Sequence, residues 1–249
     1  MTAEVAAPVR GRRRWPFVLV VLVVLTVAGM LHSPVFSVSE IEIRGADRAE
    51  VTHLVEETGV GEGAILVWVD TGRIAAAVAT DPWVRDVRVD RAWPNRIVVQ
   101  IAEHEPVAWI EGVVGWMLVS ADGTVLETAS RPGPGLLRAA LVFADLPPGS
   151  APTDPTWAEI VQMARVIEQP LASAIVLEYR GSEVWTEVRG HDIRLGNPID
   201  LADKGRTLQA MLADGIPPGM TLDLVSPRRP ALSPPPNPQG EVEGESEET

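Results

Sequence analysis

An uncharged, apolar run near the amino terminus limits what this chain can become more than any other feature does. The 25 residues from Trp15 to Ser39 contain no Asp, Glu, Lys or Arg. A bilayer core of ~30 Å needs about 20 helical residues, and the stretch from Trp15 to Phe36 supplies them. The run therefore predicts a single transmembrane helix over residues 15–36.

The charges around this run predict its orientation. Residues 1–14 carry four arginines (10, 12, 13 and 14) against one acid, Glu4, whereas the whole chain has a formal net charge of −13. Basic residues flanking a span are retained in the cytoplasm. We therefore expect a basic cytoplasmic tail over residues 1–14 and the rest of the chain outside the plasma membrane.

A cleaved signal peptide is the alternative interpretation of the same run. Small residues at 27–29 (Val-Ala-Gly) stand near a possible cleavage point. The uncharged run is longer than a usual signal core and leads directly into a strand pattern at Ser37, which favours the anchor. A twin-arginine export signal at Arg13 and Arg14 fits less well, because nothing downstream suggests a cofactor.

Composition excludes several classes of function. The strongly acidic balance argues against nucleic acid as a partner, because neutralising phosphates requires a basic surface. The chain has no cysteine, so a disulfide framework, a thiolate metal site and a cysteine nucleophile are all excluded.

Residues 37–105 are predicted to form a compact α+β unit. The stretch 37–45 alternates as a strand and ends on Gly45, and apolar spacing then predicts two short helices, near 51–58 and 74–80. Two further strands follow, at 84–89 and 97–101, with a turn at 93–95. The order is therefore strand, helix, helix, strand, strand.

Residues 106–232 are predicted to form a second, mixed β unit with two packed helices. Asp122-Gly123 is a strong signal for a tight hairpin. The helices have apolar residues on one face over 157–167 and 201–212. The strands are expected at 107–110, 116–119, 125–126, 141–143, 175–179, 184–188, 192–195 and 221–225. From Ser233 the chain is rich in proline and glutamate, which predicts a disordered acidic tail over 233–249.

A search for catalytic and ligand-binding patterns finds none. The four histidines are scattered, and no pair has the i, i+4 spacing of a helical zinc site. The triplet Glu103-His104-Glu105 alternates its side chains between the two faces of a strand, so we interpret it as a solvated strand end rather than a metal site. No phosphate-binding glycine loop is present. We expect no catalytic residue, cofactor, metal or small-molecule substrate.

Several stretches, in this order and behind a predicted span, resemble the FtsQ/DivIB family of bacterial cell-division proteins. The family has a short cytoplasmic tail, one membrane span, a POTRA domain and a following β domain. The resemblance covers residues 10 to about 232. The matching stretches are 36–45 (FSVSEIEIRG), 81–84 (DPWV), 101–108 (IAEHEPVA), 118–126 (LVSADGTVL) and 195–204 (LGNPIDLADK).

The resemblance implies that the α+β unit at 37–105 is a POTRA domain and that the protein is a non-catalytic divisome scaffold at the division septum. Members of the family bind FtsB and FtsL outside the membrane, and other divisome proteins could bind through the POTRA domain. The scaffold helps to couple ring assembly to septal peptidoglycan synthesis.

The last strand, 221–225, and the segment that follows it are the predicted partner-binding site, because an exposed strand can accept a partner strand. Pro227 and Pro230 lack the N–H groups that an edge strand offers. The alternative that the two leucines of the strand simply face the core therefore stays open. The predicted contact residues are Leu222, Leu224, Arg228, Arg229, Ala231 and Leu232.

The sequence leaves two alternative functions open. Another POTRA-bearing envelope scaffold would share the first unit but not the junction at 103–108. A membrane-anchored enzyme acting on peptidoglycan would need clustered catalytic groups, which the sequence does not reveal.

Overall fold

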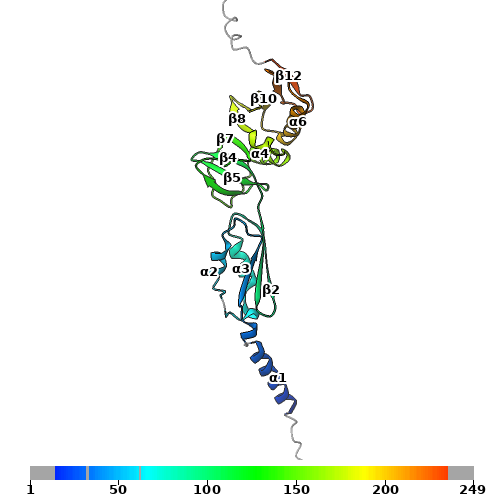
Figure 1. Cartoon of the computed structure of the whole chain (residues 1–249). Coiled ribbons are helices and arrows are strands. Elements are labelled where there is room, and N and C mark those ends of the chain that lie inside the picture. The colour runs from blue at the N-terminus through cyan, green and yellow to red at the C-terminus, as the bar shows by residue number, and fades with distance from the viewer. Residues whose placement is uncertain (1–14, 32–33, 62, 235–249) are drawn as a thin grey trace, which may run out of the picture. The chain divides into compact units, whose positions relative to one another are not determined.

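The computed structural model describes residues 15–31, 34–61 and 63–234 (Figure 1). The predicted basic tail at 1–14 and most of the predicted acidic tail, 235–249, lie outside the described residues. The chain divides into two compact units. The first holds residues up to 46, 50–79 and 86–101, and the second holds 47–49, 80–85 and everything from 102 onwards.

Helix α1 (Trp15–Leu31) occupies the uncharged run and is 17 residues long. The 3-10 helix η1 (Pro34–Phe36) follows. Pro34 cannot donate the backbone hydrogen bond of a continuing helix, which agrees with a helix shorter than the predicted 15–36. In the part of the chain that the structure describes, no helix combines the length and the apolar character that a membrane crossing requires.

The first unit has the predicted order of strand, helix, helix, strand and strand. Its three-stranded sheet has the order β1-β3-β2, with β1 parallel to β3. Asp70 caps α3 by accepting a hydrogen bond from the Arg73 N–H at 3.1 Å. The elements are β1 (Glu40–Arg44), α2 (Val51–Glu57), η2 (Leu66–Trp68), α3 (Thr71–Val78), β2 (Val84–Ala92) and β3 (Arg96–Glu103).

The core of this unit forms where the two helices meet the sheet. Four of the apolar positions that predicted the helices, Val51, Val55, Ile74 and Val78, are buried, and Leu54 is half-buried. Ile97 and Val99 of β3 point into the same core, because alternate residues of a strand share a face. The first predicted strand begins at Glu40 instead of Ser37, which forms only an isolated bridge with Ile65.

The second unit is built on one nine-stranded sheet. Its strand order is β12-β11-β10-β9-β8-β7-β4-β5-β6, with both parallel and antiparallel neighbours. The strands are β4 (Pro106–Gly112), β5 (Trp116–Ser120), β6 (Val125–Ala129), β7 (Leu137–Phe143), β8 (Val176–Arg180), β9 (Glu183–Val188), β10 (His191–Gly196), β11 (Thr221–Asp223) and β12 (Ala231–Ser233).

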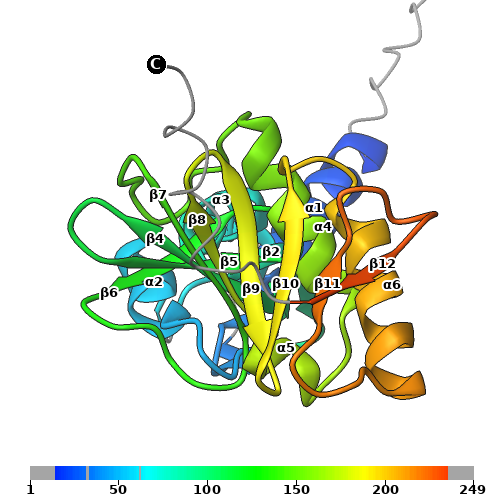
Figure 2. The ribbon, with the colours of Figure 1, turned by 90° about the horizontal axis from the view of Figure 1, so that it is seen from above.

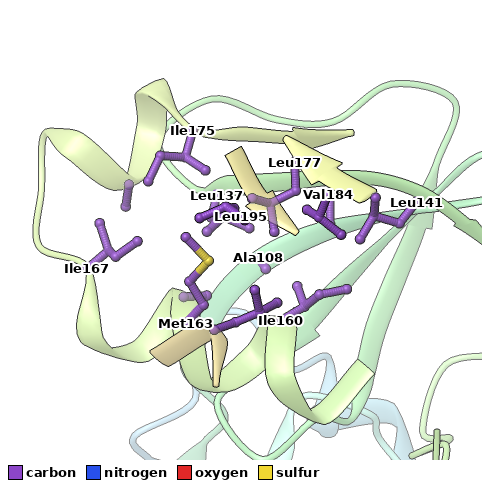
Figure 3. Close-up of a cluster of buried hydrophobic side chains, with 14 of the residues drawn as sticks. Ala108, Leu137, Leu141, Ile160, Met163, Ile167, Ile175, Leu177, Val184 and Leu195 are labelled. Carbon is purple, nitrogen blue, oxygen red and sulfur yellow. The ribbon is translucent and has the colours of Figure 1, made fainter. Parts of the chain in front are cut away.

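Helices α4 (Pro155–Val166) and α6 (Leu201–Asp214) pack against each other beside this sheet. Asp154 caps α4 by accepting a hydrogen bond from the Thr156 N–H at 2.7 Å. Ile160 and Met163 of α4 meet Leu137, Leu177 and other buried side chains from the sheet (Figure 3). The predicted helix stripe is thus confirmed as the core-facing side of α4.

A second, smaller cluster lies on the opposite face of the sheet. Trp109, Leu118 and Leu126 are buried there, and Trp83 packs against them. Trp83 precedes β2 in sequence but belongs to the second unit. The division between the units therefore differs from the predicted single boundary at 105/106, because this tryptophan covers apolar surface of the second sheet.

Two elements of the second unit were not predicted. The short helix α5 (Leu171–Ala174) follows Pro170, and β12 spans the last two residues of the predicted β unit and the first residue of the predicted tail. Ser233, the predicted first residue of the tail, pairs with Thr221. Both elements are too short for periodicity to reveal them.

Candidate functional site

Strands β11 and β12 form one border of the nine-stranded sheet. Strand β11 pairs in parallel with β10, and β12 pairs with β11 in the antiparallel sense (Figure 2). All three residues of β12 are exposed, and no described strand pairs with its outer side. At this border the outer strand is therefore β12, while β6 is the outer strand at the other border. The expectation that 221–225 forms the edge is wrong, because residues 231–233 cover it.

The six predicted contact residues separate into two groups. Leu222 and Leu224 are fully buried in the core, as the alternative interpretation of the sequence allowed. The other four are exposed: Arg228 and Arg229 in the connection between β11 and β12, and Ala231 and Leu232 on β12 itself. Only the second group can touch a partner directly.

Leu232 is the apolar side chain of this edge. It pairs directly with Leu222, so the two side chains share one face of the sheet. Leu222 is fully buried, whereas Leu232 keeps 37% of its surface exposed. A strand added outside β12 would cover Leu232 and extend the core outwards.

The prolines that counted against an edge strand lie outside it. Pro227 and Pro230 belong to the connection between β11 and β12, where the Arg229 N–H donates to the Ser226 carbonyl at 3.1 Å. Pro234 follows β12 and lacks an N–H. The prolines thus bound a very short edge, a common way to keep an open edge from indiscriminate pairing.

An ion-pair network links β11 to strands β9 and β10. Arg194 on β10 contacts both carboxylate oxygens of Glu183, at 2.6 and 2.7 Å, and Asp223 of β11 at 3.0 Å. The hydrogen bond from Arg194 lowers the pKa of Glu183 and raises the pKa of the guanidinium. The Leu224 N–H donates to the Arg194 carbonyl at 2.8 Å. These contacts place β11, and through it β12.

The single lysine of the chain is buried and stabilises the same region. Lys204 on α6 is only 1% exposed, and its Nζ donates to the carbonyls of Leu195 at 2.7 Å and Asn197 at 2.9 Å. Burial lowers the pKa of this ammonium group, and the nearby carboxylates of Asp200 and Glu159 partly oppose the shift. Lys204 therefore holds the end of β10 against α6.

No metal-binding constellation is found among the described residues: they include no group of three or more His, Asp or Glu side chains placed to hold a metal ion. The interpretation of the Glu103–Glu105 triplet as a solvated strand end is wrong for two members. Glu103 Oε1 accepts the N–H groups of residues 47, 48 and 49 at 2.7–2.9 Å. His104 Nδ1 lies 3.1 Å from Asp122 Oδ2, and its side chain is 12% exposed.

The fold and this site together define a two-unit protein with a POTRA-like first unit and an open, three-residue sheet edge on the second. Comparison with known proteins carries this further. Residues 36–104 match the family model described as a POTRA domain of the FtsQ type. The chain belongs to the FtsQ family of cell-division proteins.

Three relatives, each named cell division protein FtsQ, illustrate the similarity. The chain is 31% identical to one from Corynebacterium glutamicum over 45% of this chain and 52% of the relative. It is 32% identical to one from an Anaeromyxobacter strain, over 74% of this chain and 66% of the relative. It is 29% identical to one from Mycobacteroides abscessus, over 86% of this chain and 68% of the relative. The chain thus spans about half to two thirds of these relatives' lengths.

Proposed function

We propose that this protein is a non-catalytic scaffold of the divisome. It binds other division proteins outside the membrane and links ring assembly to septal peptidoglycan synthesis. Membership of the FtsQ family supports this proposal. The observation that carries it is the open edge strand β12, because an unpaired strand edge can accept a strand of a partner protein.

Our proposal for the partner-binding contact is strand addition at β12. A partner strand would pair with the main chain of Ala231 and Leu232, and its side chains would meet Leu232 and the exposed Arg228 and Arg229. Leu222 and Leu224 would contribute only by positioning β12. From the family resemblance, the partners are FtsB and FtsL, and acidic residues on them would complement the two arginines.

A binding assay with a matched control tests this edge. Leu232→Glu places a charge where the partner strand would bury an apolar side chain, and Val113→Glu introduces the same charge at an exposed apolar position elsewhere in the second unit. We expect the first variant to bind FtsB and FtsL about tenfold more weakly and the second to bind normally. Equal binding by both variants would exclude β12 as the contact.

We propose further that residues 15–36 anchor the chain in the plasma membrane, with the amino terminus in the cytoplasm and both units outside. The 25 uncharged residues and the four preceding arginines support this topology. Extraction of membranes with alkaline carbonate separates an anchored chain from one released by cleavage. Retention of the full-length chain in the pellet is expected, and its release in a shortened form would instead favour a signal peptide.

Localisation in dividing cells tests the scaffold role itself. A fluorescent fusion at the amino terminus is expected to form a band at midcell that appears with constriction. Uniform peripheral fluorescence from a functional fusion would retain the membrane anchor but contradict the division role, and another POTRA-bearing scaffold would then be favoured.

A further inference from the structure

Exposed apolar side chains of the first unit gather in three short segments. Outside α1, the described large apolar residues of this unit that are exposed are Val35, Trp68 and Trp93, at 57, 72 and 55%. They lie in η1, in η2 and in the turn between β2 and β3. In sequence these positions are about 30 residues apart, so only the fold can bring them together.

Backbone contacts join the first of these segments to the other two. Ser37 forms a bridge with Ile65, and the Val38 N–H donates to the Ala64 carbonyl at 2.7 Å. The Ser39 N–H donates to the Asn95 carbonyl at 2.9 Å. The segment after η1 therefore lies between the segment containing Trp68 and the turn containing Trp93.

Side chains complete the connection. Arg91 donates to the carbonyl of Leu66 at 3.2 Å and to that of Val69 at 2.6 Å, which fixes η2 against the end of β2. The rings of Phe36 and Trp93 meet edge to face, with centroids 6.0 Å apart. Hydrogen bonds thus hold together the segments that carry Trp68 and Trp93 at one end of the unit, and both side chains are exposed there.

The chemistry of this end suits a lipid surface. A tryptophan has a large apolar ring with a single N–H donor, and this combination is favoured where hydrocarbon meets water. Pro34 follows the last residue of α1, Leu31, by three positions, so their Cα atoms are at most ~10 Å apart. If α1 is in the membrane, this end of the unit lies beside it.

We propose that Val35, Trp68 and Trp93 form a membrane-contact surface, which rests in the headgroup region on the outer face of the plasma membrane. The proposal depends on the anchor proposed above. It adds a second attachment, because an anchor alone leaves the first unit free to tilt, whereas two tryptophans on separate segments hold one end of the unit at the lipid surface.

Tryptophan quenching by brominated lipids tests this surface on the full chain. The protein is reconstituted into vesicles of phosphatidylcholine and phosphatidylglycerol, with and without bromine on the acyl carbons nearest the headgroup. The wild type is compared with four variants: Trp15→Phe, Trp68→Phe, Trp93→Phe and Trp185→Phe. Trp15 reports on the anchor, and Trp185, a half-buried residue of β9, is the matched control.

We expect Trp15, Trp68 and Trp93 each to account for about one third of the emission that bromine quenches, so Trp68→Phe and Trp93→Phe should each remove about one third of it. Trp185→Phe should leave the bromine-quenched emission unchanged. If only Trp15→Phe reduces the quenching, the anchor is present and the membrane-contact surface is refuted, so the two tryptophans face solvent or a protein. If no variant reduces it, the anchor fails together with the surface. Unchanged circular dichroism confirms that each variant is folded.

Discussion

At the scale of single residues, Lys204 shows how a buried charge can serve structure rather than catalysis. Its ammonium group is enclosed, yet two backbone carbonyls at the end of β10 receive its hydrogen bonds. Without this donor, the buried Leu195 carbonyl would lose a hydrogen bond, which is more costly than the loss of a surface contact. The Asn197 carbonyl, on an exposed residue, also accepts the Ile199 N–H. The role of Lys204 is to join α6 to the strand that places β11.

Replacing Lys204 with methionine preserves the aliphatic stem but removes the donor. We expect Lys204→Met to lower the free energy of unfolding by about 2 kcal/mol, measured by chemical denaturation. Arg206→Met, on an exposed position of the same helix, is the control, with an expected change within about 0.5 kcal/mol. Equal stability of the two variants would contradict the assigned role.

The stability difference between wild type and Lys204→Met also depends on pH. Burial holds the pKa of Lys204 in the folded protein below its ordinary value of 10.5. Between these two pKa values the unfolded chain binds more protons than the folded one, so wild-type stability rises with pH. We therefore expect the difference in free energy of unfolding between wild type and Lys204→Met to increase from neutral pH towards 10.5, as measured by chemical denaturation. A difference that decreases over this range would mean that the pKa of Lys204 is raised in the folded protein, not lowered.

At the scale of secondary-structure elements, glycines at two turns meet different surroundings. Gly45 follows β1 with φ +78°, and a Cβ there would overlap the carbonyl oxygen of Ile101 on β3. Gly59 follows α2 with φ +75°, and a Cβ there would meet nothing within 4 Å. Both positions need the left-handed conformation, but only Gly45 also allows the close approach of two strands.

This difference predicts unequal effects of the same substitution. Gly59→Ala is expected to lower the free energy of unfolding by about 1 kcal/mol, from backbone strain alone. Gly45→Ala should lower it by roughly 3 kcal/mol or more, because β1 must also move away from β3. Thermal unfolding gives the two values, and faster amide exchange at Ile43 would locate the damage. Similar losses in both variants would show that strain alone matters.

At the scale of the whole molecule, the two units are interleaved in sequence. The second unit draws residues 47–49 and 80–85 from within the predicted POTRA range. Trp83 covers the apolar cluster of Trp109, Leu118 and Leu126, and the guanidinium of Arg48 lies 5.0 Å from its ring. A cut at 105/106 would therefore expose apolar surface on the second sheet.

Two fragments of the chain test this arrangement. A fragment of residues 106–234 lacks Trp83, whereas one of residues 80–234 retains it. We expect the shorter fragment to unfold at a lower denaturant concentration, with a loss of about 2 kcal/mol, because Trp109 and Leu118 lose a large packing partner. Equal midpoints for the two fragments would indicate that Trp83 contributes little to the second unit.

Much of the local structure follows from the amino-acid sequence. Alternating apolar residues predict the strands of both units, and the stripe from Trp157 to Ile167 predicts α4. These patterns can be recognised because each element buries one face, and the residues of that face recur at a short, regular spacing in the sequence. The order of elements in the first unit and the resemblance to the FtsQ family depend on the same local signals.

The identity of the sheet edge was decided only by the tertiary structure. Strand β11 looks like a terminal strand in the sequence, but three residues after a proline-rich connection return and cover it. The partners of a strand depend on hydrogen bonds between distant segments, which no local period records. The same holds for the exposure of Trp68 and Trp93, which is a property of the folded chain.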